Sequence, residues 1–268
     1  MPTVEQNTEE WGSRFDWSLS GDDWSASWGG TENLWWGTLH PRVRAFLPAA
    51  HVLEIAPGYG RVTQFLHPRC DRLTVVDLNE TCISACRQRF ADVPHITYHV
   101  NDGRSLAAVE DSTVDFALSF DSLVHADADV IEGYLKQLAT KLTADGVALL
   151  HHSNAGAYLA PLRTVARRVH ADHLAEAVCR RVNRSWRAED VSSARFAALA
   201  ERSGLRCSGQ EVISWHSRFL NDCFSTVTLP GSRWDRSRRV SRNRNFMAEV
   251  DHVHDLGNLY GPDSFGSG

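Results

Sequence analysis

The chain has 268 residues, of which 43% are hydrophobic, and its formal net charge is −5. This length suits one sizeable α/β core and leaves little room for a second full domain. The negative charge gives no general attraction to nucleic acid, and no apolar run reaches the length of a membrane span. Six cysteines occur without a C-x-x-C pair, and the first residues lack the apolar stretch of a signal peptide. We therefore expect reduced thiols and a cytoplasmic protein without membrane or nucleic-acid partners.

Residues 1–45 are predicted to form an arm that precedes the core. The arm holds six of the nine tryptophans, set among polar residues without a sustained helical or strand period. The rings either pin the arm to the core, or make it a lid that covers a ligand and keeps water out. Trp35 and Trp36 stand nearest to the first strand, so we expect these two to reach the site. The six are Trp11, Trp17, Trp24, Trp28, Trp35 and Trp36.

Residues 51–66, HVLEIAPGYGRVTQFL, predict a strand, a glycine turn and the start of a helix. A turn of this kind exposes backbone N–H groups at a helix N-terminus, where a ligand can approach closely. The dinucleotide fingerprint G-x-G-x-x-G fails, because Thr63 stands where the third small residue after Gly58 and Gly60 belongs. A nicotinamide or flavin site is therefore not expected.

The following segments continue the alternation of strands and helices that is typical of a parallel sheet. Acidic residues stand at the ends of its second and third strands. We expect a helix at residues 60–68, a strand at 73–77 ending in Asp77, a helix at 80–90, and a strand at 95–100 followed by Asn101, Asp102 and Gly103.

The glycine loop, Asp77 and Asp102, in this order, resemble the class I S-adenosylmethionine (SAM) methyltransferases. The resemblance covers residues 46 to about 228 and implies a Rossmann-like sheet of seven strands with helices on both faces. In that family the loop faces the methionine end of SAM, and the two acidic residues bind the ribose hydroxyls and the adenine amino group. Ala56 departs from the usual first glycine. The resemblance implies SAM as cofactor, bound by Glu54, Ala56, Gly58, Gly60, Asp77, Leu78, Asp102, Gly103 and Asp121.

Histidines follow the fourth and fifth strands, predicted at residues 114–120 and 147–154. Ligands of open α/β sheets bind at the carboxyl ends of the strands, so Asp121, His125 and His152 are expected at the functional edge. A lone histidine is more often structural, but histidines at two neighbouring strand ends favour contact with the substrate. We expect His125, or in its place His152, to act as general base with a pKa near 6.5.

The rest of the chain is predicted to complete a SAM-binding domain at residues 46–230. A helical, arginine-rich insertion at 156–190 overhangs the active site and either recognises the substrate or is a solvated helical pair. A capped helix near Ser192 and two further strands close the sheet. Residues 231–268 are predicted to be an arginine-rich tail, either solvated or binding phosphate.

These features predict a SAM-dependent methyltransferase, and the motif order resembles bacterial enzymes of glycan and natural-product pathways. The acceptor is expected to be a small molecule, namely a sugar or a natural product. A homodimer is compatible with the sequence. We favour O-methylation, because a hydroxyl needs a base to remove its proton. N-methylation of an amino sugar or other amine, and a metal-assisted reaction through Asp121 and a histidine, are the alternatives. A nucleic-acid methyltransferase and a non-catalytic scaffold fit the residues less well.

Overall fold

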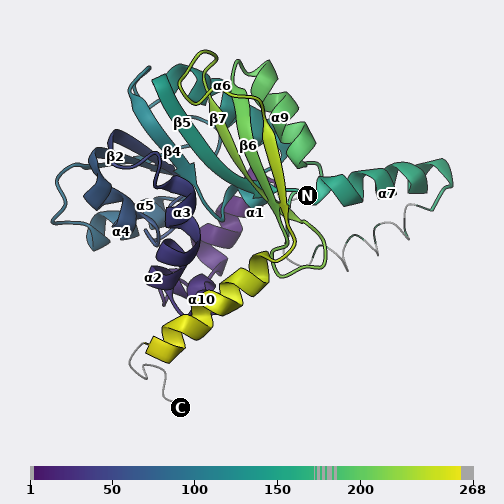
Figure 1. Cartoon of the computed structure of the whole chain (residues 1–268), viewed down its shortest axis with the longest axis horizontal. Helices are drawn as coiled ribbons and strands as arrows, with labels where there is room; N and C mark the ends of the chain where they lie inside the picture. The colour runs from purple at the N-terminus through teal and green to yellow at the C-terminus, as the bar shows by residue number, and fades with distance from the viewer. Residues whose placement is uncertain are drawn as a thin grey trace.

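A computed structural model describes residues 3–171, 173, 176, 179, 183 and 186–260 of the chain. Its centre is one eight-stranded sheet with the order β3-β2-β1-β4-β5-β7-β6-β8 (Figure 1). Strand β7 is antiparallel to both of its neighbours, and the other adjacent pairs are parallel. The strands are β1 Ala49–Ile55, β2 Cys70–Asp77, β3 Ile96–Val100, β4 Val114–Ser119, β5 Leu142–Ser153, β6 Arg206–Ile213, β7 Asp222–Thr228 and β8 Arg239–Asn243.

Helices cover both faces of the sheet, because successive strand side chains point to opposite sides. Leu53 and Leu150 pack with helices α6 (Ala128–Lys141) and α9 (Ser193–Arg202) in one core cluster. The other cluster joins Val52 and Leu149 to α5, α10 and the N-terminal segment. The other helices in the described part of the chain are α1 Val4–Glu9, η1 Glu10–Arg14, η2 Asp22–Trp28, α2 Thr31–Leu34, η3 Trp35–Leu39, α3 His40–Val43, α4 Thr63–Leu66, η4 His67–Arg69, α5 Glu80–Arg89, η5 Leu123–His125, α7 Gly156–Arg168 and α10 Phe246–Tyr260.

The predicted α/β fold with helices on both faces is confirmed, but the sheet has one strand more than predicted. The arginine-rich segment after residue 230 is not a tail up to residue 260. It contains β8, which pairs with β6, and helix α10. Phe246 and Val250 of α10 are fully buried and pack on the N-terminal segment. The arginines that precede α10 follow no helical or strand period, which is why the sequence indicated a solvated tail.

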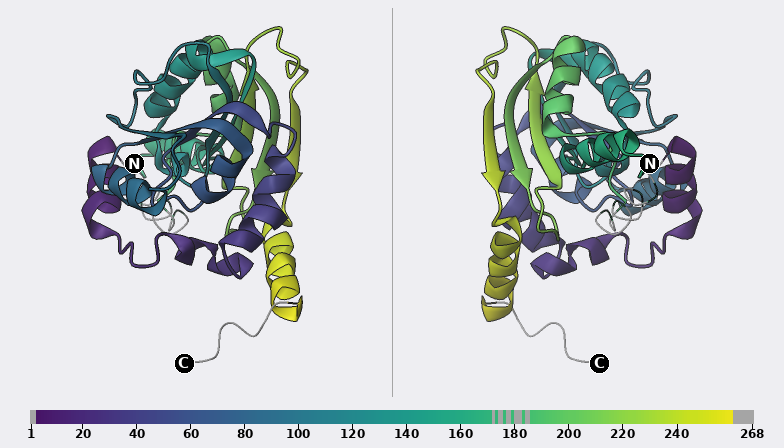
Figure 2. Two further views of the ribbon diagram at one scale, coloured as in Figure 1. Left: turned by 90° about the vertical axis from the view of Figure 1, so that its left-hand side faces the viewer. Right: turned by 90° about the vertical axis from the view of Figure 1, so that its right-hand side faces the viewer.

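The N-terminal segment folds into short helical turns rather than an irregular arm. Trp28 and Trp35 are fully buried in the second core cluster. The segment lies at the end of the sheet toward which the β8 arrow points, which is the carboxyl end of the parallel strands (Figure 2). The fold therefore places this segment next to the edge where ligands bind in open α/β sheets.

The predicted insertion after strand β5 begins with helix α7, which projects from the body of the domain (Figure 1). Most of residues 172–185 lie outside the described part of the chain, so the second half of the predicted helical pair is not described. Within the described ranges, none of the helices has the length and apolar character that crossing a membrane requires.

Candidate active site

A cavity of about 440 Å³ lies at the carboxyl ends of β1, β2 and β4. Its wall includes the residues that directly follow these strands, among them Ala56, Leu78 and Phe120. The N-terminal segment contributes the opposite wall, including Val4, Asn7, Trp11, Trp17 and Trp24. The ligand site is thus enclosed between the strand ends and a segment remote in sequence.

The glycine loop after β1 requires backbone conformations that favour glycine. Gly58 and Gly60 have φ values of +59° and +82°, and Ala56 adopts +57° in the place of the usual first glycine. A Cβ on Gly60 would lie 2.5 Å from Cε2 of Phe90, so this glycine also allows α5 to pack on the loop. Ala56 and Gly58 line the cavity, whereas Gly60 does not. Gly60 therefore shapes the loop without facing the ligand.

Two buried carboxyl groups at the ends of β1 and β2 face this loop. Oδ1 of Asp77 accepts a hydrogen bond from the backbone N–H of Asn79 at 2.9 Å, and Oδ2 accepts one from Gly58 at 3.3 Å. Burial raises the pKa of Asp77 to about 6, against the effect of these N–H groups. Glu54 accepts a 2.6 Å hydrogen bond from Thr63, and burial raises its pKa to about 7. Both carboxyl groups line the cavity.

The turn after β3 differs from its predicted role. The carboxylate of Asp102 accepts hydrogen bonds from the backbone N–H groups of Arg104 and Ser105 at 2.9 and 2.7 Å, and it does not line the cavity. Its side chain stabilises its own turn. Gly103 does line the cavity, where a Cβ would meet Val4 at 3.1 Å. The prediction that the Asp102 side chain contacts the cofactor is therefore not supported by its position.

The loop after β4 begins with Asp121 in a left-handed conformation, at a φ of +60°. Oδ2 of Asp121 lies 3.0 Å from Nη2 of Arg61, which also donates through Nη1 to Ser25 at 3.2 Å. The backbone N–H of Asp121 donates to Nδ1 of His151 at 3.1 Å. Asp121 and Arg61 both line the cavity. Asp121 is thus held by Arg61, which follows the glycine loop, and by His151 of β5.

His125 is the histidine that reaches the cavity from this loop. Its Nδ1 lies 2.9 Å from the carbonyl oxygen of Trp186. The side-chain amide of Asn7 donates to the backbone carbonyl oxygen of His125 at 3.3 Å. A carbonyl oxygen can only accept, so Nδ1 carries the proton and Nε2 is the acceptor of the ring. Burial, assisted by the charge of Arg187, lowers the pKa of His125 to about 4. The imidazole is therefore neutral at pH 7.

His152 was predicted as the alternative base, but the structure places it in the core. Its side chain is fully buried, stacks on Phe196 at 4.0 Å and contacts Ser153 and Ser225 through its two ring nitrogens. It does not line the cavity. Neighbouring residues of a strand face opposite sides, so His151, and not His152, points toward the site network.

The aromatic wall comes from other tryptophans than those predicted. Trp11, Trp17 and Trp24 line the cavity, whereas Trp35 stacks on Phe65 in the core and Trp36 is 47% exposed. Trp17 stacks on Tyr59 of the glycine loop, with ring centroids 4.4 Å apart. Trp11 lies 5.2 Å from the ring of His125. Proximity to the first strand in sequence was a poor guide, because the earlier turns fold back over the loop.

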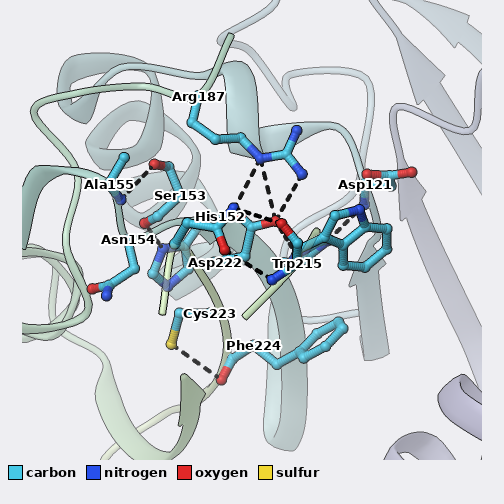
Figure 3. A network of polar contacts seen from close by, with 12 residues as sticks. Asp121, His152, Ser153, Asn154, Ala155, Arg187, Trp215, Asp222, Cys223 and Phe224 are labelled. Carbon is cyan, nitrogen blue, oxygen red and sulfur yellow. Dashed lines mark hydrogen bonds and ion pairs between the residues drawn. The ribbon is translucent and has the colours of Figure 1, made fainter. Parts of the chain in front are cut away.

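Residues beyond the predicted set also line the cavity. Arg187, from the segment after the insertion, forms a buried ion pair with Asp222, the first residue of β7 (Figure 3). Trp215 and His216 contribute from the connection between β6 and β7. Arg61, Asn79 and Ser122 also line the cavity, and each had a signal in the sequence because it closely follows one of the strands β1, β2 and β4. The others come together through tertiary contacts.

The charge of the cavity suits a cationic cofactor such as SAM. Five carboxyl groups line it, against two guanidinium groups that are each paired with a carboxylate. Asp77 and the loop at Gly58 both lie in the wall of this cavity. Within the described ranges, no three His, Cys, Asp or Glu side chains gather in a way that could hold a metal ion. The five are Asp23, Glu54, Asp77, Asp121 and Asp127.

The sheet order, the glycine loop and the acidic residue after β2 define a class I methyltransferase fold. Comparison with known proteins agrees. Residues 52–146 match the family described as "Methyltransferase domain". The fold is therefore that of the class I SAM-dependent methyltransferases, and the matched residues form a methyltransferase domain whose cofactor is SAM.

Relatives support this assignment. The chain is 30% identical over 170 residues to Nodulation protein S of Sinorhizobium fredii, an alignment that covers 62% of this chain and 66% of that protein, just under two thirds. A chain in the complex of the Haloferax volcanii Trm112 methyltransferase activator and its methyltransferase has a TM-score of 0.53 at 17% identity, over 80% of this chain and 97% of that chain. N-methyltransferase NodS of Bradyrhizobium japonicum, bound to S-adenosyl-L-homocysteine, gives 0.50 at 16% identity, over 71% and 85%. These structures share the fold.

Proposed function

We propose that this protein transfers the methyl group of SAM to a nitrogen of a small molecule that carries an amine, such as an amino sugar. The observation that carries the proposal is the state of His125. Its Nδ1–H donates to the Trp186 carbonyl, which leaves Nε2 as the acceptor of a ring that lines the cavity. Such a ring can orient an amine by accepting a hydrogen bond from one of the N–H groups of the amine.

The weak basicity of His125 favours an amine over a hydroxyl. A general base works best when its pKa lies near the working pH, and burial lowers the pKa of His125 to about 4. A hydroxyl must lose its proton as it attacks, whereas a neutral amine attacks with its lone pair. The cofactor supplies a methyl group on a sulfonium, so alignment by the cavity walls provides much of the acceleration. For the Bradyrhizobium relative, the name N-methyltransferase states transfer to nitrogen.

O-methylation of a sugar or natural product, with His125 as base, is the second candidate. It is favoured by the same Nε2, which is the acceptor of the ring in either reaction. The small-molecule acceptor, the cytoplasmic location and a homodimer are further proposals. Light scattering after size-exclusion chromatography tests the assembly.

N-methylation and O-methylation differ in how much turnover a variant of His125 should lose. A hydrogen-bond acceptor contributes roughly tenfold, whereas a general base contributes about 10²–10⁴-fold. We expect His125→Ala to lose about tenfold in turnover, and His125→Gln to recover most of it, because the amide oxygen also accepts. His152→Gln is the control in the core. The measurement is turnover with labelled SAM on paired amine and hydroxyl acceptors, with mass spectrometry of the product.

The pH dependence gives an independent test. With an amine acceptor the rate should rise with pH up to the pKa of the amine, since only its neutral form attacks. Protonation of His125 should not add to the decrease of the rate between pH 7 and 5, because the pKa of His125 is about 4. Methylation of the hydroxyl partner alone, with a loss of 10² or more in both His125 variants, would overturn the nitrogen proposal in favour of oxygen.

A further inference from the structure

Asp23 lines the cavity, and one oxygen of its carboxyl group has no hydrogen-bond partner among the described residues. Asp23 belongs to η2 of the N-terminal segment, and its Oδ1 is buried with no hydrogen-bond partner among the residues that the structure describes. Leaving a buried polar atom unpaired costs free energy, so such atoms in native proteins need an explanation. A ligand that donates a hydrogen bond to Asp23 supplies one.

Two aromatic rings in the wall of the same cavity restrict the chemistry of that ligand. Trp11 and Trp24 line the same cavity, with ring centroids 5.6 Å apart and planes at 89°. The guanidinium of Arg61 lies over the ring of Trp24 at 5.4 Å, so this ring already attracts a cation. Arg61 itself donates to Asp121 and Ser25. Neither of these hydrogen bonds involves the Asp23 carboxyl group.

We propose that Asp23, with Trp11 and Trp24, forms a binding site for an ammonium group. A carboxylate that shares a cavity wall with two perpendicular indoles favours a cation that also donates hydrogen bonds. Two molecules bring such a group to this cavity. One is the cofactor, through the α-ammonium of its methionine part, and the other is an amine acceptor before it loses its proton. Only the acceptor source rests on the proposed function.

The decisive variant is Asp23→Asn, which keeps the shape and removes the charge. Asp22→Asn is the matched control on the same turn, because Asp22 accepts from Thr31 at 2.6 Å and does not line the cavity. Trp11→Leu keeps apolar bulk and removes the aromatic ring. Thermal unfolding of each variant checks that the fold is kept.

The first measurement uses calorimetry with S-adenosylhomocysteine and with its analogue that lacks the α-amino group. If Asp23 holds the cofactor's ammonium, Asp23→Asn weakens the first ligand about 10- to 100-fold and leaves the second unchanged. This result supports the site whether or not an amine is methylated, so it stands apart from the proposed function.

The second measurement uses protein saturated with S-adenosylhomocysteine and the probes D-glucosamine and D-glucose, followed by saturation-transfer NMR. These probes share a ring and differ in one ammonium group. If Asp23 holds the acceptor, the wild type prefers glucosamine at least tenfold, and Asp23→Asn and Trp11→Leu lose that preference. If Asp23→Asn matches Asp22→Asn within twofold for both the cofactor pair and the probe pair, the proposed ammonium site is wrong.

Discussion

Nη2 of Arg187 lies 2.8 Å from Oδ2 of Asp222, and both side chains are buried. Nε of Arg187 donates to the same carboxylate at 2.9 and 3.2 Å (Figure 3). Burial alone would raise the pKa of Asp222, but the guanidinium and His151 hold it well below its ordinary range. Nε2 of His151 lies 3.4 Å from this carboxylate, while Nδ1 accepts from Asp121. The pair thus connects the segment after the insertion to the loop after β4.

Removing one partner of this ion pair should destabilise the protein strongly. We expect Asp222→Ala to lower the free energy of unfolding by about 3–5 kcal/mol, because it leaves the Arg187 charge buried without its main partner. The double variant Arg187→Met with Asp222→Leu should lose less, since it buries no charge. Urea unfolding of the three proteins provides the comparison. A double variant less stable than Asp222→Ala would contradict this account.

Asp77 should determine cofactor affinity. We expect Asp77→Ala to weaken S-adenosylhomocysteine binding by about 1.5–3 kcal/mol, the scale of hydrogen bonds to a charged group. We expect the ionised carboxylate to accept from the ribose hydroxyls. Because its pKa in the free protein is about 6, affinity should then also decrease as the pH falls below 6. Asp71→Ala, at the exposed start of the same strand, is the control. Calorimetry between pH 5 and 8 measures both effects.

Glu54 should make the cofactor-free protein less stable at high pH. Its folded pKa of about 7 lies above the ordinary value of 4.5, so its contribution to stability is complete below pH 4.5 and is lost as the pH rises through 7. The shift corresponds to about 3 kcal/mol. Glu54→Gln keeps an acceptor for Thr63 and should therefore gain stability relative to the wild type at pH 8, but not at pH 5. Parallel pH profiles of the two proteins would contradict the assigned pKa.

The N-terminal segment is predicted to act as a lid over the cofactor. The test variant lacks residues 1–20 and keeps Trp28, because Trp28 is fully buried in the core. The truncated protein should remain folded by circular dichroism and bind S-adenosylhomocysteine at least about tenfold more weakly. Loss of about 60 Å² of apolar contact suffices for this effect. Unchanged affinity and turnover after truncation would leave the segment with an anchoring role alone.

Local patterns in the sequence predicted the parts of the protein that are built from consecutive residues. The strand and turn at residues 51–60 need an apolar run and glycine-type conformations, and both signals are local. Asp77 follows its strand directly, so its place at the sheet edge could be predicted from the fold. Ser192 caps α9 through the N–H of Arg195, as its position before the helix indicated. The predicted strand β7 was likewise confirmed.

The choice between neighbouring side chains could not be made from the sequence. His151 and His152 are adjacent in β5, and alternation puts them on opposite faces without saying which face leads to the ligand. Helix α9 packs on the face of His152 and buries it against Phe196. Asp102 also stands where the resembling family has a cofactor ligand, but its carboxylate accepts hydrogen bonds from backbone N–H groups of its own turn.

The sequence by itself determined the α/β class, the cofactor loop and the acidic residue after β2, because strand pattern and turn chemistry act over a few neighbouring residues. Only the tertiary structure decided which tryptophans cover the cavity, which histidine faces it, and that Arg187 and Asp23 belong to its wall. Trp11 and His125 are 114 positions apart, yet their rings lie 5.2 Å from each other. Such contacts depend on how remote segments pack at the sheet edge, and no local pattern encodes that packing.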